Sequence, residues 1–447
     1  MAPSSEKCKQ PPEFPGGGAK SYDMRPLLKA GRRDRVKRPG AKKEKARGSP
    51  PCFQAGADSA NCLAAMTTKA DNSDFLAPFA ADLDALAARD RLRALAPRAG
   101  CDFASNDYLG LAESQIYRDA ASAALARGVP LGAGGSRLLR GNHPEHEALE
   151  QEAARFFGAE AALFFGAGFA ANEALFSTLP QRGDLILYDE LIHASAHEGM
   201  RLSRAESRPV RHNDPAAFEE AIKCAAADRI WIAVESLYSM DGDTAPLAEL
   251  ADIALRRGAF LVVDEAHATG VFGPGGRGLA HGLEGRDNVV TVHTCGKALG
   301  LSGALVCLPL VMRDFLVNRC RQFIFATAPS PLLAASVRAA LGIIEAADDR
   351  RAALAQRVTR ARDLLRLATG AEPSSTQIQP VIVGSDARAL ALAGRMQAQG
   401  YDIRAIRPPT VPRGTSRLRI SLTLNPRDDE IDAMIALLGR EMERLAP

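Results

Sequence analysis

The sequence predicts an α/β fold with a mainly parallel sheet, followed by a smaller α+β domain. Short apolar runs recur along the middle of the chain, each of a length typical of strands that are buried on both faces. Helical patterns fill the gaps between these runs, and such alternation is typical of a parallel sheet with right-handed crossover connections. Ligands of such sheets bind at the carboxyl ends of the strands. We therefore expect functional side chains directly after the apolar runs.

The runs that we assign to the sheet are residues 161–165, 185–188, 230–234, 260–263, 289–292 and 304–308. One intervening segment shows why the gaps are assigned to helices. Leu247, Leu250, Ala251 and Ala254 recur at helical spacing, and Gly258 follows as a residue that readily ends a helix.

After about residue 346 the pattern changes. Residues 380–384 read as a strand, residues 388–399 have a helical pattern, and residues 418–423 alternate between apolar and polar side chains. This change predicts the smaller α+β domain at the C-terminal end.

The composition indicates a globular protein of the cytoplasm. The 447 residues are 46% hydrophobic and 24% charged, which is enough for a large core and two globular domains. No apolar run approaches the roughly 18 residues of a membrane span, and the N-terminus lacks the apolar stretch of a secretory signal. We therefore expect no membrane segment.

The N-terminal segment differs from the rest of the chain. Residues 1–66 hold 14 Lys and Arg against 6 Asp and Glu, and proline and glycine interrupt any regular period. We expect residues 1–65 to be a disordered basic extension, with Met66 as a candidate for the natural start. The basic run 32–47 has no interleaved aromatic residues, so a passive tail is favoured over a nucleic-acid-binding arm. The acidic residues of the segment argue against a mitochondrial transit peptide.

A lysine and an aspartate follow two of the predicted strands. Asp264 comes directly after the run 260–263, and Lys297 lies shortly after the run 289–292. A lysine amine can condense with the aldehyde of pyridoxal phosphate (PLP), and a buried carboxylate can keep the pyridine nitrogen of that cofactor protonated. A surface lysine and a strand-end aspartate also occur together by chance, so other segments must agree.

Three segments at the same edge of the sheet do agree. The glycine-rich turn 166–172 opens a helix, where backbone N–H groups can hold a phosphate, although such turns also arise for steric reasons. His193 follows the next strand and can lie on a cofactor ring or handle protons, and its alternative is a helix-capping or core histidine. The loop 235–243 adds hydroxyls and carboxylates, and its alternative is a turn rich in side-chain caps.

Two motifs also suggest other classes of protein. His193 and His197 have the spacing of metal ligands, but no third ligand is evident and the eight cysteines include no C-x-x-C pair. Residues 264–267 (DEAH) spell the metal-binding box of ATP-driven helicases, but no G-x-x-x-x-G-K-[ST] loop precedes them. A non-catalytic regulator that binds a cofactor or nucleic acid has only the basic extension in its favour. We expect no metal and no nucleic acid partner.

From residue 93 to the C-terminus the chain resembles the α-oxoamine synthases, fold-type I PLP enzymes that condense an amino acid with an acyl thioester. The matching segments are residues 105–111 (SNDYLGL), 132–137 (GAGGSR), 143–150, 239–243 (SMDGD) and 264–267 (DEAH). The resemblance implies a homodimer and a seven-stranded sheet in the large domain. It places an N-terminal segment at residues 66–115, the PLP-binding large domain at 116–345 and the small C-terminal domain at 346–447.

The resemblance also implies roles for individual residues at the cofactor ring. Lys297 would link covalently to PLP, Asp264 would pair with the ring nitrogen, and His193 would stack on the ring, which makes these three the expected catalytic residues. Ser239 and His267 would bind the phenolic oxygen of the ring.

Further residues are implied at the two ends of the site. The phosphate would be held by Gly168, Phe169 and Thr294, with Thr327 contributed by the other subunit. The expected substrate ligands are Asn106 and Arg419 for the amino acid carboxylate and Arg93 for the acyl substrate.

Segments near the C-terminus narrow the implied activity. Residues 377–380 (QIQP), 405–412 (AIRPPTVP) and 414–419 (GTSRLR) resemble the branch of the family that serves biotin biosynthesis. The implied reaction is the decarboxylative condensation of L-alanine with a pimeloyl thioester of coenzyme A or acyl carrier protein, which gives 8-amino-7-oxononanoate, carbon dioxide and the free thiol. The sister activities, 2-amino-3-oxobutyrate CoA ligase and 5-aminolevulinate synthase, are the alternatives.

Overall fold

The computed structural model describes residues 73–95 and 97–445, so the basic extension expected at residues 1–65 lies outside the described residues. The chain divides into two compact units, Met1–Asp82 and Leu83–Pro447. Of the first unit, the structure describes only the beginning of helix α2 (Ser73–Ala87). Everything that follows concerns the second unit.

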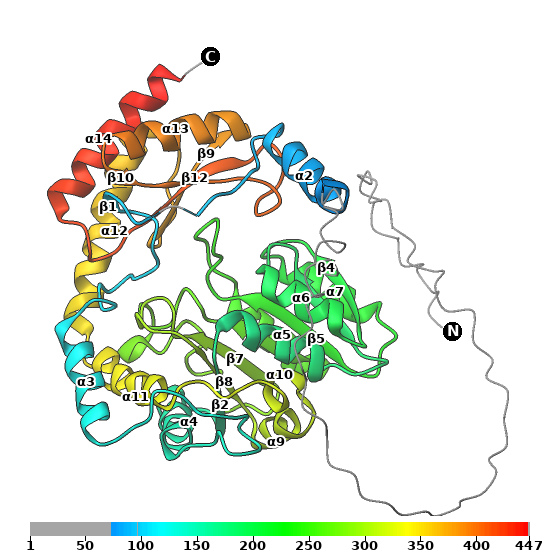
Figure 1. The fold of residues 1–447 in the computed structure, drawn as a ribbon. Helices are drawn as coiled ribbons and strands as arrows, with labels where there is room; N and C mark the ends of the chain where they lie inside the picture. Colours follow the sequence, from blue (N-terminus) through cyan, green and yellow to red (C-terminus); the bar gives the residue numbers. More distant parts are fainter. Residues whose placement is uncertain (1–72, 96, 446–447) are drawn as a thin grey trace, which may run out of the picture. The chain divides into compact units, whose positions relative to one another are not determined.

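The centre of the second unit is a seven-stranded sheet with the strand order β2-β8-β7-β6-β5-β3-β4 (Figure 1). Its strands are β2 (Ala161–Phe165), β3 (Leu185–Asp189), β4 (Glu206–Val210), β5 (Ile230–Glu235), β6 (Phe260–Asp264), β7 (Val289–Thr294) and β8 (Ala304–Leu308). Strands β3 to β7 pair in parallel, whereas β8 runs antiparallel to both of its neighbours, β2 and β7. The predicted α/β fold with a mainly parallel seven-stranded sheet is confirmed.

Strand β4 is the one strand of this sheet that the apolar runs did not predict. Its sequence is ESRPV, and only Val210 is buried. The strand lies at the edge of the sheet and pairs with β3 alone. Because most side chains of this edge strand are exposed to solvent, they need not be apolar, and the strand leaves no hydrophobic pattern in the sequence.

Helices cover both faces of the sheet, and alternate strand residues point to opposite faces. Val262 of β6 packs with α5 (Gly168–Thr178) and α6 (Ala194–Leu202) on one face. Leu261 and Val263 pack with α7 (Pro215–Lys223) and α8 (Leu247–Arg257) on the other. Helix α8 has the predicted extent, and Gly258 ends it with a φ of 63°. The other helices around this sheet are α3 (Gln115–Ala126), α4 (Pro144–Phe157), α9 (Leu310–Arg319), α10 (Arg321–Ile324) and α11 (Pro331–Glu345).

The C-terminal part is an α+β arrangement, as predicted. A three-stranded antiparallel sheet has the order β11-β12-β9, with β11 (Arg404–Ile406), β12 (Ser416–Ser421) and β9 (Ile378–Gly384). Helices α12 (Asp348–Thr369), α13 (Asp386–Ala398) and α14 (Asp428–Arg444) accompany it. Strand β1 (Cys101–Asp102) pairs in parallel with β10 (Tyr401–Asp402).

One hydrophobic core joins the C-terminal sheet to the loop after β7. Leu418 and Ile420 of β12 belong to the same buried cluster as Tyr108, Ala298 and Leu299. This shared core holds β12 and the segment around Tyr108 close to Lys297. In the part of the chain that the structure describes, no helix is long and apolar enough to cross a bilayer.

Candidate active site

Polar side chains gather where four neighbouring parallel strands end. Asp189, Glu235, Asp264 and Thr294 are the last residues of β3, β5, β6 and β7, which lie side by side in the sheet. All four residues are buried. The predicted position of the site, at the carboxyl ends of the strands, therefore holds a dense set of polar groups.

Lys297 lies on the loop between β7 and β8, and residues 70–447 contain only one other lysine, Lys223. Its Nζ is 2.7 Å from Nε2 of His267. Burial lowers the pKa of Lys297 to about 8, although the carboxylates of Asp264 and Glu235 oppose this shift. Burial and the neighbouring positive charges of Lys297 and Arg419 hold the pKa of His267 well below its usual range. A neutral His267 can accept a hydrogen bond from the Lys297 ammonium at Nε2.

The hydrogen bond from Lys297 continues through His267 to the segment 106–108. The Tyr108 hydroxyl lies 2.6 Å from Nδ1 of His267 and donates to Oδ1 of Asn106 over 3.0 Å. Because His267 accepts from Lys297 at Nε2, its proton is on Nδ1 and donates to Tyr108. The same Asn106 oxygen accepts from Nη1 of Arg419 at 3.0 Å. One hydrogen-bonded chain thus connects Lys297 to Arg419.

Arg419 is a buried guanidinium whose charge has no carboxylate partner within salt-bridge distance among the described residues. Its Nε donates to the carbonyl oxygen of Ser239 at 2.6 Å, and its Nη1 also donates to Oγ of Ser421 at 2.7 Å. Only 7% of its surface is exposed. Burying an unpaired charge is costly, so the arrangement favours an anionic ligand at this position.

Asp264 is held in place by two donors. Its Oδ2 accepts from Nδ2 of Asn172 at 2.6 Å, and its Oδ1 accepts from the backbone N–H of Ala266 at 2.9 Å. The same Asn172 nitrogen also contacts Oγ of Ser195, which lies 2.8 Å from Nδ1 of His193. His193 caps α6 by accepting from the N–H of Ser195, so the capping alternative describes its local role, and its imidazole is exposed to the site.

The start of α5 forms a cradle for a small anion. Gly168 is the first residue of this helix, and no side chain caps the helix N-terminus. A Cβ atom on Gly168 would lie 3.1 Å from Oγ1 of Thr294, so the glycine allows the hydroxyl to approach the helix start closely. Phe169 follows and is 47% exposed. Free N–H groups at a helix start, beside a hydroxyl, suit a phosphate.

These residues fit PLP. The donor set comprises an amine of lowered pKa, a buried carboxylate at the end of β6, and an uncapped helix start beside the threonine hydroxyl at the end of the neighbouring strand β7. Together they match the aldehyde, the pyridine nitrogen and the phosphate of that cofactor.

A cavity of about 530 Å³ opens over the site. Arg93, His193, Ser239 and Asp241 line it, and residues 409–412 form another wall. The structure thus brings Arg93 to the same cavity as His193 and Ser239. Thr327 is not in this cavity: it lies on the connection between α10 and α11, where its side chain is exposed.

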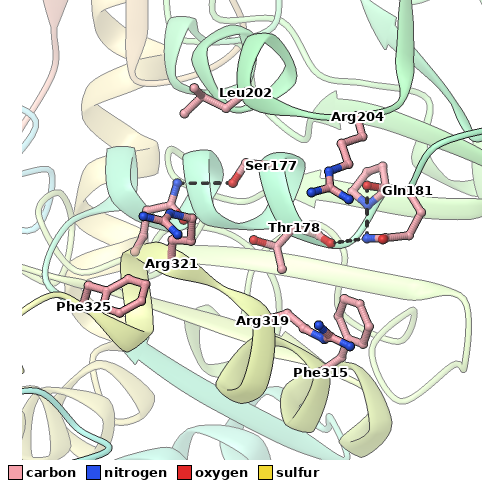
Figure 2. A pocket seen from close by; sticks show the side chains of 11 residues that line it. Ser177, Thr178, Gln181, Leu202, Arg204, Phe315, Arg319, Arg321 and Phe325 are labelled. Atoms are coloured by element: carbon pink, nitrogen blue, oxygen red, sulfur yellow. Dashed lines mark hydrogen bonds between the residues drawn. The ribbon is translucent and has the colours of Figure 1, made fainter. Parts of the chain in front are cut away.

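A larger cavity, of about 920 Å³, lies elsewhere. It is formed by the end of α5, the end of α6, α9 and α10, and Figure 2 shows Arg321 beside Phe325, Arg319 beside Phe315, and Arg204 near Gln181. None of the site residues expected from the sequence lines it. The candidate active site is therefore identified by the polar residues that line the smaller cavity, and not by cavity volume.

Sequence reasoning assigned no role to three residues of the site. Tyr108, Asn172 and Glu235 lie in segments that the sequence singled out, but their partners are Asn106, His267, Asp264 and Ser239. His267 and Asp264 are distant in the sequence from Tyr108 and Asn172, whereas Asn106 and Ser239 are near neighbours of Tyr108 and Glu235. The one sequence signal for Tyr108 was its position as the only aromatic residue in the segment 105–111, which the resemblance had singled out.

Comparisons with known proteins identify the family of this chain. The family model for aminotransferase class I and II matches residues 99–436. The 8-amino-7-oxononanoate synthase of Chromobacterium violaceum is 45% identical over 350 residues, which cover 77% of this chain and 90% of that protein.

Two solved structures are also similar. An 8-amino-7-oxononanoate synthase from Francisella tularensis superposes with a TM-score of 0.67 at 28% identity, covering 77% of this chain and 98% of that one. A high-resolution structure of SPT with a PLP internal aldimine gives a TM-score of 0.72 at 27% identity, covering 77% of this chain and 87% of that one. SPT is serine palmitoyltransferase.

The chain therefore belongs to the class I and II aminotransferase family of PLP-dependent enzymes, and within it to the α-oxoamine synthases of the 8-amino-7-oxononanoate synthase type. It is a PLP-dependent acyltransferase, as the sequence segments predicted.

Proposed function

We propose that this enzyme condenses L-alanine with a pimeloyl thioester, and that decarboxylation then gives 8-amino-7-oxononanoate for biotin biosynthesis. Support comes from relatives of that name at 41–46% identity over most of the chain. The donor thiol is coenzyme A or acyl carrier protein. Serine palmitoyltransferases share the fold at lower identity, so serine with a long-chain thioester belongs in the tests.

The unpaired, buried guanidinium of Arg419 is the observation that carries this proposal. It lies on the same hydrogen-bonded chain as Lys297, through Asn106, Tyr108 and His267. A substrate carboxylate would complete its charge pairing, with Asn106 as a second polar ligand. An amino acid bound in this way would have its Cα close to the amine end of the chain.

The geometry supports an assignment of the residues that would hold the cofactor. When bound, PLP supplies an electron sink that stabilises negative charge at the Cα of the amino acid. Lys297 would be its covalent attachment point, and Asp264, fixed by Asn172, would pair with the ring nitrogen. Its phosphate is assigned to Gly168, Phe169 and Thr294, and its ring contacts to His193, Ser239 and His267.

Lys297 is also the group best placed to move the Cα proton. With its pKa lowered to about 8, roughly a tenth of the amine is unprotonated at pH 7, far more than for an ordinary lysine. His267 can accept a hydrogen bond from Nζ and keeps the amine oriented. The walls of the cavity, including Arg93 and residues 409–412, would exclude water and receive the acyl chain.

The proposal includes a homodimer that works in the cytoplasm. Thr327 is exposed and Phe325 has 69% of its surface exposed, on the connection that follows α10. We assign Thr327 to the phosphate of the partner's site, which requires two copies of the chain. A monomer with full activity at low concentration would overturn this part.

Steady-state kinetics test the proposed function. Purified enzyme with PLP is assayed with alanine, glycine and serine against pimeloyl, acetyl, succinyl and palmitoyl thioesters, and the products are identified by mass spectrometry. We expect the highest kcat/KM for alanine with a pimeloyl thioester, although a single methyl group gives only about 10- to 200-fold discrimination. Arg419→Lys should raise the KM for alanine more than that for the thioester. A preference for glycine or serine with another thioester would assign a sister activity.

A further inference from the structure

Glu235 is a buried carboxyl that the reaction described above does not use. It is the last residue of β5, it is 2% exposed, and it stands opposite Asp264 in the register of β5 and β6. Its Oε2 accepts from the backbone N–H of Ser239 at 3.2 Å. Its Oε1 is buried and has no hydrogen-bond partner among the described residues.

The peptide of Ser239 connects Glu235 to the proposed carboxylate ligand. The N–H of Ser239 binds Glu235, and its carbonyl oxygen accepts from Nε of Arg419 at 2.6 Å. The Glu235 carboxyl therefore fixes the N–H of the Ser239 peptide, and the carbonyl oxygen of Ser239 in turn binds the Arg419 guanidinium. Without an acceptor for its N–H, this peptide can rotate and carry its carbonyl away from Arg419.

The surroundings of Glu235 favour a proton on its carboxyl. Asp264 and Asp189 are its negative neighbours, and Lys297, which is shared with Asp264, is a positive neighbour. Two further cations lie one contact away: Arg419 donates to the carbonyl oxygen of Ser239, and His212 pairs with Asp189 and Asp243. An ionised carboxylate with one unpartnered oxygen would carry a large desolvation cost, whereas a neutral carboxyl would not. Burial, and then the charge of Asp264, raise the pKa of Glu235 well above its usual range.

We propose that Glu235 is a positioning residue for the amino acid carboxylate: a neutral, buried carboxyl that fixes the Ser239 peptide and, through it, the guanidinium of Arg419. The negative charge that faces the cofactor is then carried by Asp264 alone. The inference rests on the proposed function, because it takes Arg419 to be the ligand of the substrate carboxylate.

Two variants of Glu235 separate geometry from charge. Glu235→Gln keeps an oxygen acceptor for the Ser239 N–H and is neutral, so we expect its kinetics and its pH profile to match wild type within about twofold. Glu235→Leu removes the acceptor, and its KM for L-alanine should rise about tenfold with a smaller change in kcat, the size expected when one buried hydrogen bond is lost. Glu284→Gln, another buried carboxyl, is the matched control and should leave the KM for alanine unchanged.

A comparison of two ligands shows whether the effect passes through the carboxylate. Binding of L-alanine and of L-alaninamide to the PLP-loaded enzyme is followed by the visible absorbance of the cofactor. Glu235→Leu should weaken L-alanine but not L-alaninamide, which has no carboxylate. Equal weakening of both ligands, or none, would overturn the positioning role even if the variant unfolds at a lower temperature.

Infrared spectroscopy of the cofactor-free protein tests the protonation state directly. The difference between wild type and Glu235→Gln at pH 7 should contain the carbonyl stretch of a protonated carboxyl. A carboxylate band in its place, or a pH profile that moves in Glu235→Gln, would show that Glu235 is ionised and would contradict the proposal. If wild type does not accept alanine at all, the proposed function fails, and the same ligand comparison is then made with the amino acid that does bind and its amide.

Discussion

The Nζ of Lys297 lies 2.7 Å from Nε2 of His267, and this contact fixes how protons are arranged across the site. With Nε2 as the acceptor, the imidazole proton lies on Nδ1 and points at the Tyr108 hydroxyl, 2.6 Å away. The Tyr108 hydroxyl then accepts from His267 and donates its own proton to Oδ1 of Asn106. The amine and the substrate ligands are therefore oriented by a single hydrogen-bonded chain.

Removing the Tyr108 hydroxyl should break this chain. Tyr108→Phe leaves the buried Nδ1–H of His267 without an acceptor, at a cost of about 1–3 kcal/mol, so kcat/KM for L-alanine should fall about 5- to 150-fold. Tyr117→Phe is the matched control, because the Tyr117 hydroxyl is buried without a partner among the described residues. An equal kcat/KM for the two variants would show that these hydrogen bonds do not orient Lys297.

Reconstitution with PLP should depend on pH in a way that reports Lys297. Burial lowers the pKa of the amine to about 8, and only the unprotonated amine reacts with an aldehyde. The rate at which PLP is incorporated into cofactor-free enzyme should therefore rise with pH and level off above about 8. Stopped-flow absorbance measures this rate, and a midpoint near that of an ordinary lysine would contradict the buried environment.

The cradle at Gly168 predicts a specific loss of cofactor affinity. Gly168→Ala adds a methyl group 3.1 Å from Oγ1 of Thr294, at the place assigned to the phosphate, so the Kd for PLP should rise while the fold persists. Gly342→Ala in α11 is the control, because its new Cβ meets no atom within 4 Å, and it should be neutral or stabilise by up to about 1 kcal/mol. Fluorescence titration of PLP compares the two, and an unchanged Kd in Gly168→Ala would move the phosphate elsewhere.

The free energy of unfolding should fall as pH rises, because Glu284 is a buried carboxyl that lies outside the proposed cofactor site. Burial raises the pKa of Glu284 to about 8, and neither of its oxygens has a hydrogen-bond partner among the described residues. Its Oε1 lies 3.8 Å from Nε2 of His293, whose own pKa burial lowers to about 3. Between the ordinary glutamate pKa of about 4.3 and this value, the folded state holds a proton that the unfolded state releases, so the free energy of unfolding decreases with rising pH.

Glu284→Gln should remove this contribution. The variant should be more stable than wild type near pH 8, and the difference should vanish towards pH 4. Thermal unfolding across this range measures it, and parallel curves for the two proteins would exclude a raised pKa at Glu284.

The sequence predicted the strands that are buried on both faces, because burial leaves an apolar run. The edge strand β4 has one buried side chain and left no such pattern. Asp264 and Lys297 could be found because their chemistry is distinctive and strand ends converge at one edge of a parallel sheet.

The rest of the site depends on contacts between distant segments. Every residue of β12 is buried, so the alternation of apolar and polar residues could not distinguish a ligand-binding role for Arg419 from a purely structural one. The links from Tyr108 to His267 and from Glu235 through Ser239 to Arg419 join residues that only the packed core brings together. The sequence resemblance supplied Arg419, but the roles of Tyr108 and Glu235 required the structure.

The central claim is that Lys297 is the residue to which PLP is attached, and borohydride trapping tests it most directly. Wild type, Lys297→Ala and Lys223→Ala are loaded with PLP, reduced with borohydride and digested, and the modified peptide is located by mass spectrometry. Lys223 is the control because it is the only other lysine in residues 70–447. We expect the label on Lys297 in wild type and in Lys223→Ala, and no label within residues 70–447 in Lys297→Ala. A label on Lys223, or stoichiometric labelling that survives in Lys297→Ala, would contradict the account.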